Sequence, residues 1–270
     1  MKLTFLGTGS FFTSRENFHT NILLEDNDGK ALLIDCGSDI RCSLYDADKD
    51  PTKIDSIYIS HMHGDHVGGL EYMGFMSYFN PDYEGKPKII AHQDVMADIW
   101  QILEPSMEVL HGQRGYFHTY FDIENILYDE SKFKWHDIEF NLMEFNHVIN
   151  IHGSSMFSYG LEFIINNKTI LITTDCCYAN PVNKYWEETI NGHNHILGHY
   201  NYVFNDCETL KYLDLPNSKV HCLYDELKRL DTDVKRNMWL VHYQGYKEQL
   251  PNAKDDGFAG FVTKGQIFEI

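Results

Sequence analysis

The first sixty residues alternate short apolar runs with stretches of turn-forming residues. Runs rich in Leu, Ile, Phe and Tyr are typical of buried strands, while the Gly, Asn and Asp residues between them favour turns. The runs that predict strands are 2–6, 21–25, 31–35 and 54–59. A short helix is predicted over 40–45, ahead of the last of these strands.

The remaining chain shows the same mixture of strand-like and helix-like segments. Helices are predicted over 68–76 and 94–103, where apolar residues recur at helical spacing. The predicted strands are 88–91, 137–145, 168–175 and 238–243. A helical segment is expected to end at Leu230, and the apolar stretches 257–262 and 265–270 predict a closing hairpin. Alternating strands and helices of this kind are typical of an α/β fold.

The stretch 104–129 fits neither pattern. Large apolar and aromatic residues are crowded into it, together with glycines and two histidines. Such an aromatic-rich insertion is either an element that covers the core or a lid and interface, and the sequence leaves both open.

Length and composition predict one large domain over residues 1–270. Hydrophobic residues make up 43% of the chain, and it contains no Pro/Ser/Gly-rich linker and no repeat. Neither a signal-peptide pattern nor an apolar stretch of bilayer-spanning length is present, so we expect a cytoplasmic protein without membrane contact. The six cysteines lack disulfide-framework spacing, which predicts reduced thiols.

Acidic residues dominate the charge of the chain. Asp and Glu number 40 against 22 Lys and Arg, which gives a formal net charge of -18. Binding to a large nucleic acid depends on clustered Lys and Arg that displace counterions, and the sequence has no basic run. The charge therefore disfavours a large nucleic acid as a partner and is explained most simply by a solvated surface.

A histidine-rich string follows the predicted strand 54–59. Residues 61–66 read His-Met-His-Gly-Asp-His, and the glycine lets the backbone bend within the string. Three imidazoles and one carboxylate within six residues suit a borderline metal such as zinc. The alternative is a polar turn that happens to be rich in histidine.

This His-x-His-x-Asp-His string, placed after a strand and before a helix, resembles the signature of the metallo-β-lactamase superfamily of hydrolases. The resemblance implies an α/β fold of the four-layer αββα sandwich type. It also implies two metal ions held by the string and by three later residues, namely a histidine, an aspartate and a last histidine.

The three later positions have matches in this sequence. His147 follows a predicted strand and is favoured over His152, which lies in a glycine-containing loop. Asp175 ends a predicted strand and matches the bridging carboxylate of the family. His242 lies at the end of a late strand and is favoured over His221, which is expected to open a helical segment.

Two other clusters compete as metal ligands. Cys176 and Cys177 follow the aspartate directly, but adjacent side chains point apart and a thiolate would have to displace a ligand that is already supplied. His195 and His199 have helical spacing, but the glycines around them favour a surface loop.

The ligand set that the resemblance implies places two Zn²⁺ ions in each chain, with Mn²⁺ or Fe²⁺ as alternatives. The first ion takes His61, His63 and His147. The second takes Asp65, His66 and His242, and Asp175 bridges the two. A hydroxide shared by the metals is the implied nucleophile, and Asp65 is also expected to orient the attacking water.

Within the superfamily the chain is most similar to the phosphodiesterase branch, which includes RNase Z-like tRNA 3′-end endonucleases and anti-Pycsar cyclic-nucleotide phosphodiesterases. The endonucleases carry a His-Glu-Ala-Thr motif, whereas this chain has Asn205 at the place of its histidine. An asparagine cannot act as a general acid, so we expect that role at His221, at Tyr224 or at a metal-bound water. The residues expected to bind substrate are Ser158, Tyr159, Asn205 and Tyr224.

The expected substrate is a small cyclic nucleotide, such as a 3′,5′-cyclic nucleoside monophosphate, opened to a linear monophosphate. The alternatives are an RNase Z-like RNA phosphodiesterase, a thioesterase or lactone hydrolase with the same two zinc ions, and a non-enzymatic interaction protein. Exposed aromatic residues in 104–129 predict a homodimer. The aromatic residues considered for base stacking are Tyr116, Phe117, Tyr120, Tyr159, Tyr224 and Tyr243, most of which are expected in the core.

Overall fold

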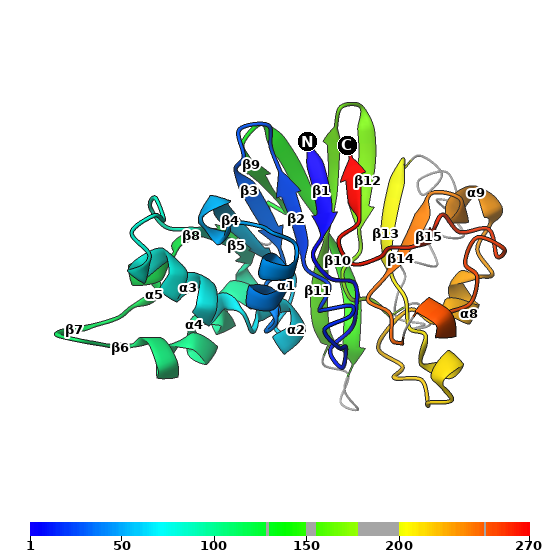
Figure 1. Cartoon of the computed structure of the whole chain (residues 1–270), viewed down its shortest axis with the longest axis horizontal. Helices are drawn as coiled ribbons and strands as arrows, with labels where there is room; N and C mark the ends of the chain where they lie inside the picture. The colour runs from blue at the N-terminus through cyan, green and yellow to red at the C-terminus, as the bar shows by residue number, and fades with distance from the viewer. Residues whose placement is uncertain (128–129, 150–154, 178–199, 246) are drawn as a thin grey trace. The chain divides into compact units, whose positions relative to one another are not determined.

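The computed structural model describes residues 1–127, 130–149, 155–177, 200–245 and 247–270. Internal contacts divide the chain into two units. The first unit consists of Met1–Gly7, Phe18–Trp135 and Lys264–Ile270, and the second consists of Thr8–Asn17 and His136–Thr263. A β-sheet forms the centre of each unit (Figure 1).

The sheet of the first unit has the strand order β16-β1-β2-β3-β4-β5-β8. Its strands are β1 (Lys2–Phe5), β2 (Ile22–Glu25), β3 (Ala31–Ile34), β4 (Ile54–Ile59), β5 (Lys88–His92), β8 (Asp122–Ile126) and β16 (Ile267–Glu269). The strands from β3 to β8 pair in parallel, whereas β16, β1, β2 and β3 pair antiparallel. Strands β3, β4 and β5 are almost entirely buried, as parallel strands covered on both faces should be.

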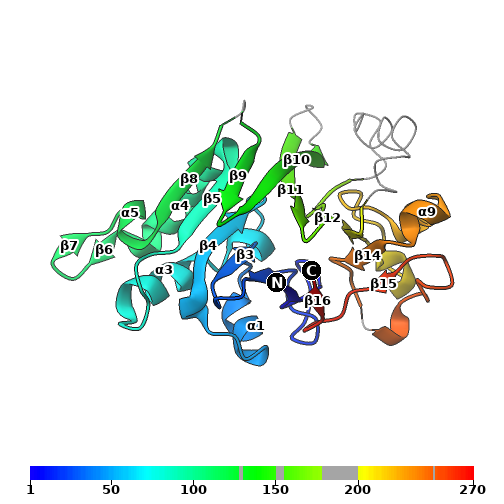
Figure 2. The ribbon, with the colours of Figure 1, turned by 90° about the horizontal axis from the view of Figure 1, so that it is seen from above.

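Helices of the first unit follow its parallel strands. They are α1 (Ile40–Asp46), η1 (Pro51–Lys53), α2 (Gly64–Val67), α3 (Leu70–Phe79), α4 (Gln93–Met107) and α5 (Phe117–Tyr120). Helix α4 packs against α3, β5 and β8 (Figure 2). A small hairpin of β6 (Val109–Leu110) and β7 (Gln113–Arg114) follows α4, and β9 (Lys132–Trp135) ends this part of the chain.

In the second unit the strand order is β15-β14-β13-β12-β11-β10. The strands are β10 (Ile138–Ile149), β11 (Ser155–Ile165), β12 (Lys168–Ile172), β13 (Tyr202–Asp206), β14 (Met238–Val241) and β15 (Gly260–Phe261). Short helices η2 (Leu210–Leu213), α8 (Tyr224–Leu227), α9 (Thr232–Lys235) and η3 (Lys247–Gln249) lie between or after them. Strands β12 to β15 are parallel, so their carboxyl ends meet at one edge of the sheet, where functional residues gather in α/β folds.

The pattern-based predictions match most of these elements, but one predicted pairing is wrong and several predicted ends differ from those observed. The predicted closing hairpin is wrong, because β15 pairs in parallel with β14 whereas β16 pairs antiparallel with β1. Helix α4 continues beyond the predicted end at residue 103 and passes Pro105. Its last turn is retained because Met107 is fully buried and its carbonyl accepts a hydrogen bond from the Tyr120 hydroxyl at 2.6 Å.

The aromatic-rich stretch 104–129 serves two purposes in the first unit. Phe117, Tyr120 and Phe121 are buried and belong to the core. Val109 and Tyr116 are exposed by 80% and 57%, on and beside the β6–β7 hairpin. Within the described ranges, no helix combines the length and hydropathy that crossing a membrane requires.

Gly160→Ala should destabilise the second unit, because β11 and β12 approach closely at this position. A Cβ atom at residue 160 would lie 2.5 Å from the Ile172 carbonyl oxygen and 2.8 Å from that of Thr173. Overpacking of this kind costs about 1–3 kcal/mol in the free energy of unfolding, measured by urea denaturation.

Ile164→Ala is the matched control on the same strand, because the Ile164 side chain is 62% exposed. It should change the free energy of unfolding by less than about 0.5 kcal/mol. Equal losses in the two variants would contradict the steric account.

Candidate metal centre

The histidine-rich string forms the turn between β4 and α2, as its position after a strand predicts. His61 is fully buried just beyond the end of β4, and His63 is the N-cap residue of α2. Asp65 and His66 lie on α2 itself and are buried. Four candidate ligand side chains are therefore held on one short, well-packed turn.

A buried carboxylate behind this turn fixes the rings of two histidines. Asp35 accepts hydrogen bonds from the Ser60 backbone amide at 2.8 Å, from the Ser60 hydroxyl at 2.9 Å and from Nδ1 of His66 at 2.7 Å. Because the Ser60 hydroxyl donates to Asp35, its oxygen accepts from Nδ1 of His61, 3.0 Å away. In both rings Nε2 then faces another side chain of the string, and such hydrogen bonds to Nδ1 orient histidines at metal sites.

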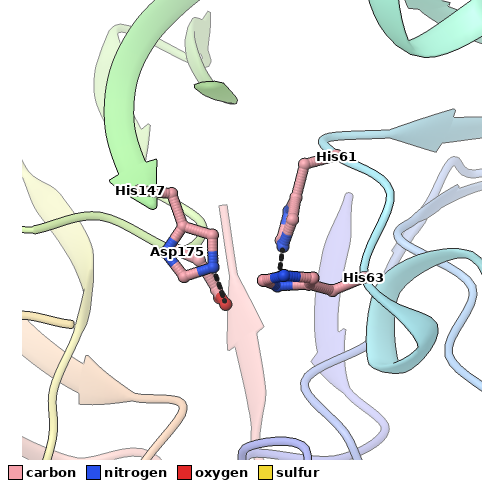
Figure 3. Close-up of side chains that lie close together, drawn as sticks. All are labelled: His61, His63, His147 and Asp175. Carbon is pink, nitrogen blue, oxygen red and sulfur yellow. Dashed lines mark hydrogen bonds and ion pairs between the residues drawn. The ribbon is translucent and has the colours of Figure 1, made fainter. Parts of the chain in front are cut away.

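Distances within the string match those between two ligands of one metal ion. Nε2 of His61 lies 3.1 Å from Nδ1 of His63 (Figure 3), and Nε2 of His66 lies 3.4 Å from Oδ2 of Asp65. Two atoms bound to one tetrahedral zinc ion at about 2.0–2.1 Å are separated by about 3.3 Å. The string thus supplies two ligand pairs, each with the spacing that zinc requires.

Three residues on or after strands of the second unit form a second set of candidate ligands. The prediction that His147 follows the end of a strand is wrong, because β10 extends from Ile138 to Ile149 and contains it. His147 lies at an irregularity in the β10–β11 pairing, between Asn146 and Val148, and a bulge of this kind re-aims a side chain. Its Nδ1 donates to the Val220 carbonyl at 2.9 Å, which leaves Nε2 as the ligand atom. Asp175 follows β12 after a shorter strand than predicted, since β12 ends at Ile172.

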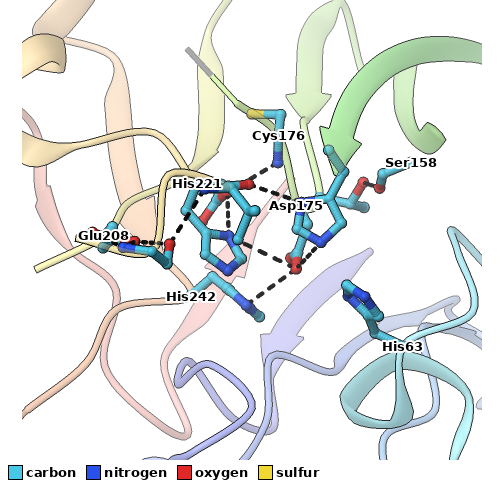
Figure 4. A network of polar contacts seen from close by, with 12 residues as sticks. His63, Ser158, Asp175, Cys176, Glu208, His221 and His242 are labelled. Atoms are coloured by element: carbon cyan, nitrogen blue, oxygen red, sulfur yellow. Dashed lines mark hydrogen bonds and ion pairs between the residues drawn. The ribbon is translucent and has the colours of Figure 1, made fainter. Parts of the chain in front are cut away.

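One oxygen of Asp175 is approached by two imidazoles. Its Oδ2 lies 3.4 Å from Nε2 of His147 (Figure 3) and 3.3 Å from Nε2 of His242, which follows β14 (Figure 4). All three side chains are at most 2% exposed as residues. Thr174 and His242 have positive φ angles of 55° and 61°, a backbone strain that the surrounding structure retains at this site.

His221 and Asp206 form a buried pair next to Asp175. Nδ1 of His221 donates to Oδ2 of Asp206 at 2.9 Å and lies 3.8 Å from Oδ2 of Asp175 (Figure 4). The same Asp206 oxygen accepts the Cys176 backbone amide at 2.9 Å. Among the described residues, Oδ1 of Asp206 has no hydrogen-bond partner.

The pKa values of His221 and Asp206 are both shifted from their usual values. Burial by itself would lower the pKa of His221, but the attraction and hydrogen bond of Asp206, reinforced by Asp175, outweigh it and raise this pKa. Burial also raises the pKa of Asp206, although the nearby His221 opposes that effect. The raised pKa of His221 is therefore set by its two neighbouring carboxylates, first Asp206 and then Asp175.

The segment that carries His221 is held by Glu208. The Glu208 carboxylate accepts the backbone amide of Ser218 at 3.0 Å and also bonds its hydroxyl. The backbone amide of Glu208 donates to the Cys222 carbonyl at 2.7 Å. These contacts position the loop before α8, and His221 lies in this loop rather than opening a helix.

The four residues predicted to bind substrate are all buried within the second unit. The hydroxyls of Ser158 and Thr174 lie 2.7 Å apart, and Nδ2 of Asn205 donates to the Asp206 carbonyl. Tyr159 is 3% exposed. Tyr224 belongs to the hydrophobic core, and its hydroxyl donates to Asp256 at 2.7 Å. Their role towards substrate stays a prediction.

The competing ligands considered in the sequence analysis either have other contacts or lie outside the described residues. None of the six cysteines forms a disulfide, as predicted, and Cys176 Sγ lies 3.4 Å from Cys222 Sγ rather than at a metal-ligand position. The rival His152 and the histidines of 193–199 lie outside the described residues.

Sequence reasoning missed Asp35, Ser60 and Asp206, which orient the rings of the candidate histidines. Asp35 and Asp206 each lie at the end of a strand, and that position was the signal available. Nothing in the spacing of Asp35 and His66 along the chain indicates that they bond to each other.

The residues present fit divalent metal ions. Buried imidazole and carboxylate groups are the donors that zinc prefers. The neighbouring carboxylate, hydroxyl and carbonyl groups occupy Nδ1 of His66, His61 and His147, so Nε2 is the candidate ligand atom of these rings. Within the second unit alone, the ligand atoms of Asp175, Asp206, His221 and His242 all lie within 4.8 Å of one another.

Asp35→Asn should weaken zinc binding, because the variant keeps the size of the side chain but removes the charge that orients His66. Loss of such a supporting carboxylate lowers metal affinity by about 10- to 100-fold. Competition with a chromogenic zinc chelator measures this effect. Asp28→Asn, at an exposed turn position, is the control and should bind zinc as the wild type does; equal affinities for all three proteins would contradict the role of Asp35.

Known proteins with similar sequences or folds cover the whole chain. A sequence of Paenibacillus harenae described as anti-Pycsar protein Apyc1 is 27% identical over 256 residues, which is 90% of each chain. The metallo-β-lactamase fold protein YhfI from Bacillus subtilis has a TM-score of 0.68 and 19% identity, and the match covers 99% of both chains. The short form of human tRNase Z has a TM-score of 0.67 and 16% identity over 100% of this chain and 99% of that one.

These similarities confirm the predicted α/β class, the metallo-β-lactamase fold and the assignment as a hydrolase of the phosphodiesterase branch. The family model described as anti-Pycsar protein Apyc1 matches residues 1–268. The chain therefore belongs to the anti-Pycsar protein Apyc1 family.

Proposed function

We propose that this chain is a two-zinc phosphodiesterase that opens 3′,5′-cyclic nucleoside monophosphates to linear monophosphates. The observation that carries the proposal is the single oxygen of Asp175 that lies 3.4 Å from a His147 nitrogen and 3.3 Å from a His242 nitrogen. A carboxylate oxygen flanked by two imidazole ligands suits a position shared by two metal ions.

The number of ligands supports joining the two sets of residues around two ions. A tetrahedral zinc ion takes four ligands, and the string of the first unit supplies two pairs, so each ion lacks two. The second unit supplies two further histidines and one carboxylate that both ions can share. The proposed sets are His61, His63 and His147 for one ion and Asp65, His66 and His242 for the other, with Asp175 bridging.

When bound, two such ions lower the pKa of water towards neutrality and neutralise charge on the phosphate. Asp65 accepts a hydrogen bond from the attacking water and orients it towards phosphorus. His221 gives the proton on Nε2 to the leaving ribose oxygen, while its Nδ1–H remains bonded to Asp206. The water oxygen becomes bonded to phosphorus, one of the two phosphorus–oxygen bonds to the ribose breaks, and a linear monophosphate with a free ribose hydroxyl results. The proton that the attacking water loses is released to solvent, and His221 regains its proton from solvent.

Charge supports a small substrate over RNA. The chain has a formal net charge of -18, which repels a polyanion, whereas a cyclic mononucleotide carries one phosphodiester that two metal ions neutralise. The resemblance to cyclic-nucleotide phosphodiesterases and membership of the anti-Pycsar family also support a cyclic nucleotide as the substrate.

Purified, zinc-loaded protein should convert cAMP, cGMP, cCMP and cUMP to linear monophosphates and leave a precursor tRNA intact. Asp175→Ala should abolish turnover, because the bridging carboxylate is lost, and Asp233→Ala, at a surface side chain that is 80% exposed, should not. Liquid chromatography of the products measures both. Cleavage of the tRNA without opening of any cyclic nucleotide would contradict the proposed substrate, and inactivity on all five would favour a thioester or lactone.

His221→Gln should slow the opening of cAMP by about 10²- to 10⁴-fold, because the ribose oxygen then leaves without a proton donor. The loss should be much smaller for methyl p-nitrophenyl phosphate, whose leaving group needs no proton. Equal losses on the two substrates would contradict the role of His221.

His221 donates a proton to the leaving ribose oxygen only in its protonated form, which is the form present below its pKa. Since that pKa is raised, wild-type activity on cAMP should persist through neutral pH and fall as pH rises beyond the usual histidine range. This alkaline fall should be absent from the pH profile of His221→Gln.

A homodimer remains part of the proposal. Figures 1 and 2 both show the β6–β7 hairpin extending away from the rest of the first unit, and Val109 and Tyr116 expose 80% and 57% of their surface there. Light scattering at micromolar concentration should give twice the 31.5 kDa mass of the chain. Val109→Ser with Tyr116→Ser should lower that mass, and a monomer mass for the wild type would contradict the dimer.

A further inference from the structure

Two adjacent phenylalanines are exposed on the loop between β1 and β2. Phe12 is 92% exposed and Phe11 is 53% exposed, although most large aromatic side chains of the described chain are buried. Their ring centroids lie 5.0 Å apart with the ring planes at 70°, an edge-to-face pair. Leaving two large apolar rings in water is unfavourable unless they meet a ligand or a partner.

The loop holds these rings at its tip. The Thr13 backbone amide donates to the Ser10 carbonyl at 3.0 Å, so Phe11 and Phe12 occupy the two central positions of a β-turn. Gly, Asn, Asp and Pro are the residues that favour such positions. A pair of phenylalanines there departs from local turn preference, and such departures tend to mark functional positions.

Both ends of this loop are fixed to the segment that follows His242. Gly9 forms a parallel bridge with Tyr243, and the Thr8 hydroxyl donates to the Tyr243 hydroxyl at 3.1 Å. The Asn17 side chain donates to the Gly245 carbonyl at 2.9 Å. These contacts all lie within the second unit, so the loop and the candidate ligand His242 are held by the same short stretch of chain.

This attachment limits how far the backbone of the turn lies from the candidate ligand His242. Phe11 is two residues from Gly9, so their Cα atoms are at most about 7 Å apart. Gly9 pairs with Tyr243, the neighbour of His242 in sequence. The turn that carries the exposed rings is therefore joined to the stretch of chain that directly follows the candidate ligand His242.

We propose that Phe11 and Phe12 form the platform on which the nucleobase of the substrate stacks. The inference rests on the proposed function, because it assigns the base of the same cyclic nucleotide to this loop. An aromatic ring stacks with every base and reads none of its edges, so the platform gives broad base tolerance. Tyr159, Tyr224 and Tyr243, which the sequence offered for stacking, are at most 4% exposed and cannot take this role without rearrangement.

The test compares substrates with and without a base. Wild type, Phe11→Ala/Phe12→Ala and Phe11→Ala/Phe12→Trp are assayed on cAMP, cUMP and the abasic ribose 3′,5′-cyclic phosphate. The wild type should prefer the nucleotides, and the double alanine variant should lose that preference through a KM increase of roughly tenfold or more. Tryptophan at position 12 should restore much of it.

Tyr45→Ala is the matched control, because Tyr45 is an 84% exposed aromatic residue on α1 of the first unit. It should keep the preference of the wild type for nucleotides over the abasic compound. Thermal melting by circular dichroism identifies any variant that has lost its fold; if the double alanine variant has, Phe12→Ser alone takes its place.

Calorimetric binding of a slowly cleaved cyclic adenosine phosphorothioate tests base stacking on the platform independently of catalytic turnover. Binding that weakens in the alanine variant, without turnover of any cyclic nucleotide by the wild type, would keep the platform and overturn the proposed function. Turnover of nucleotide and abasic substrate with equal kcat/KM by the wild type, or an unchanged preference in the alanine variant, would overturn the platform.

Discussion

The rest of the site depends on a buried carboxylate that two imidazoles approach. Asp175 is 1% exposed, and its Oδ2 is the atom nearest to Nε2 of both His147 and His242. Burying a charge is costly unless it is paired, and in the proposed function two divalent cations that share this oxygen supply the pairing. The parallel order of β12, β13 and β14 places the residues that follow these strands at one sheet edge, at the cost of a positive φ at His242.

A second layer of hydrogen bonds orients the rings of His61, His66 and His147. Asp35 and Ser60 hold the Nδ1 sides of the string histidines, and the Val220 carbonyl does the same for His147. Because Nδ1 is occupied in His61, His66 and His147, these three rings offer Nε2 towards the site. His221 has the same arrangement with Asp206, but its raised pKa makes it a proton donor rather than a ligand in the proposed reaction.

The string and the strand that precedes it were predictable because their signal is local. Candidate ligands within six residues and a buried strand before them can be read without knowing the fold, and Asp175 and His242 were proposed from their places after strands. His147 instead lies within β10, at a pairing irregularity that the sequence did not predict. Asp35 was not predictable in this way, since it bonds residues 25 and 31 positions away. The sheet that β16 joins was missed for the same reason, because a three-residue strand carries no information about its partner.

The account makes a direct claim about metal positions, and anomalous diffraction from zinc-loaded crystals at the zinc absorption edge tests it. It predicts two peaks about 3.5–4 Å apart, one next to the His61 and His63 rings, the other next to His66, with an Asp175 oxygen between them. A single peak, or two peaks of which only one touches Asp175, would contradict the shared-carboxylate site.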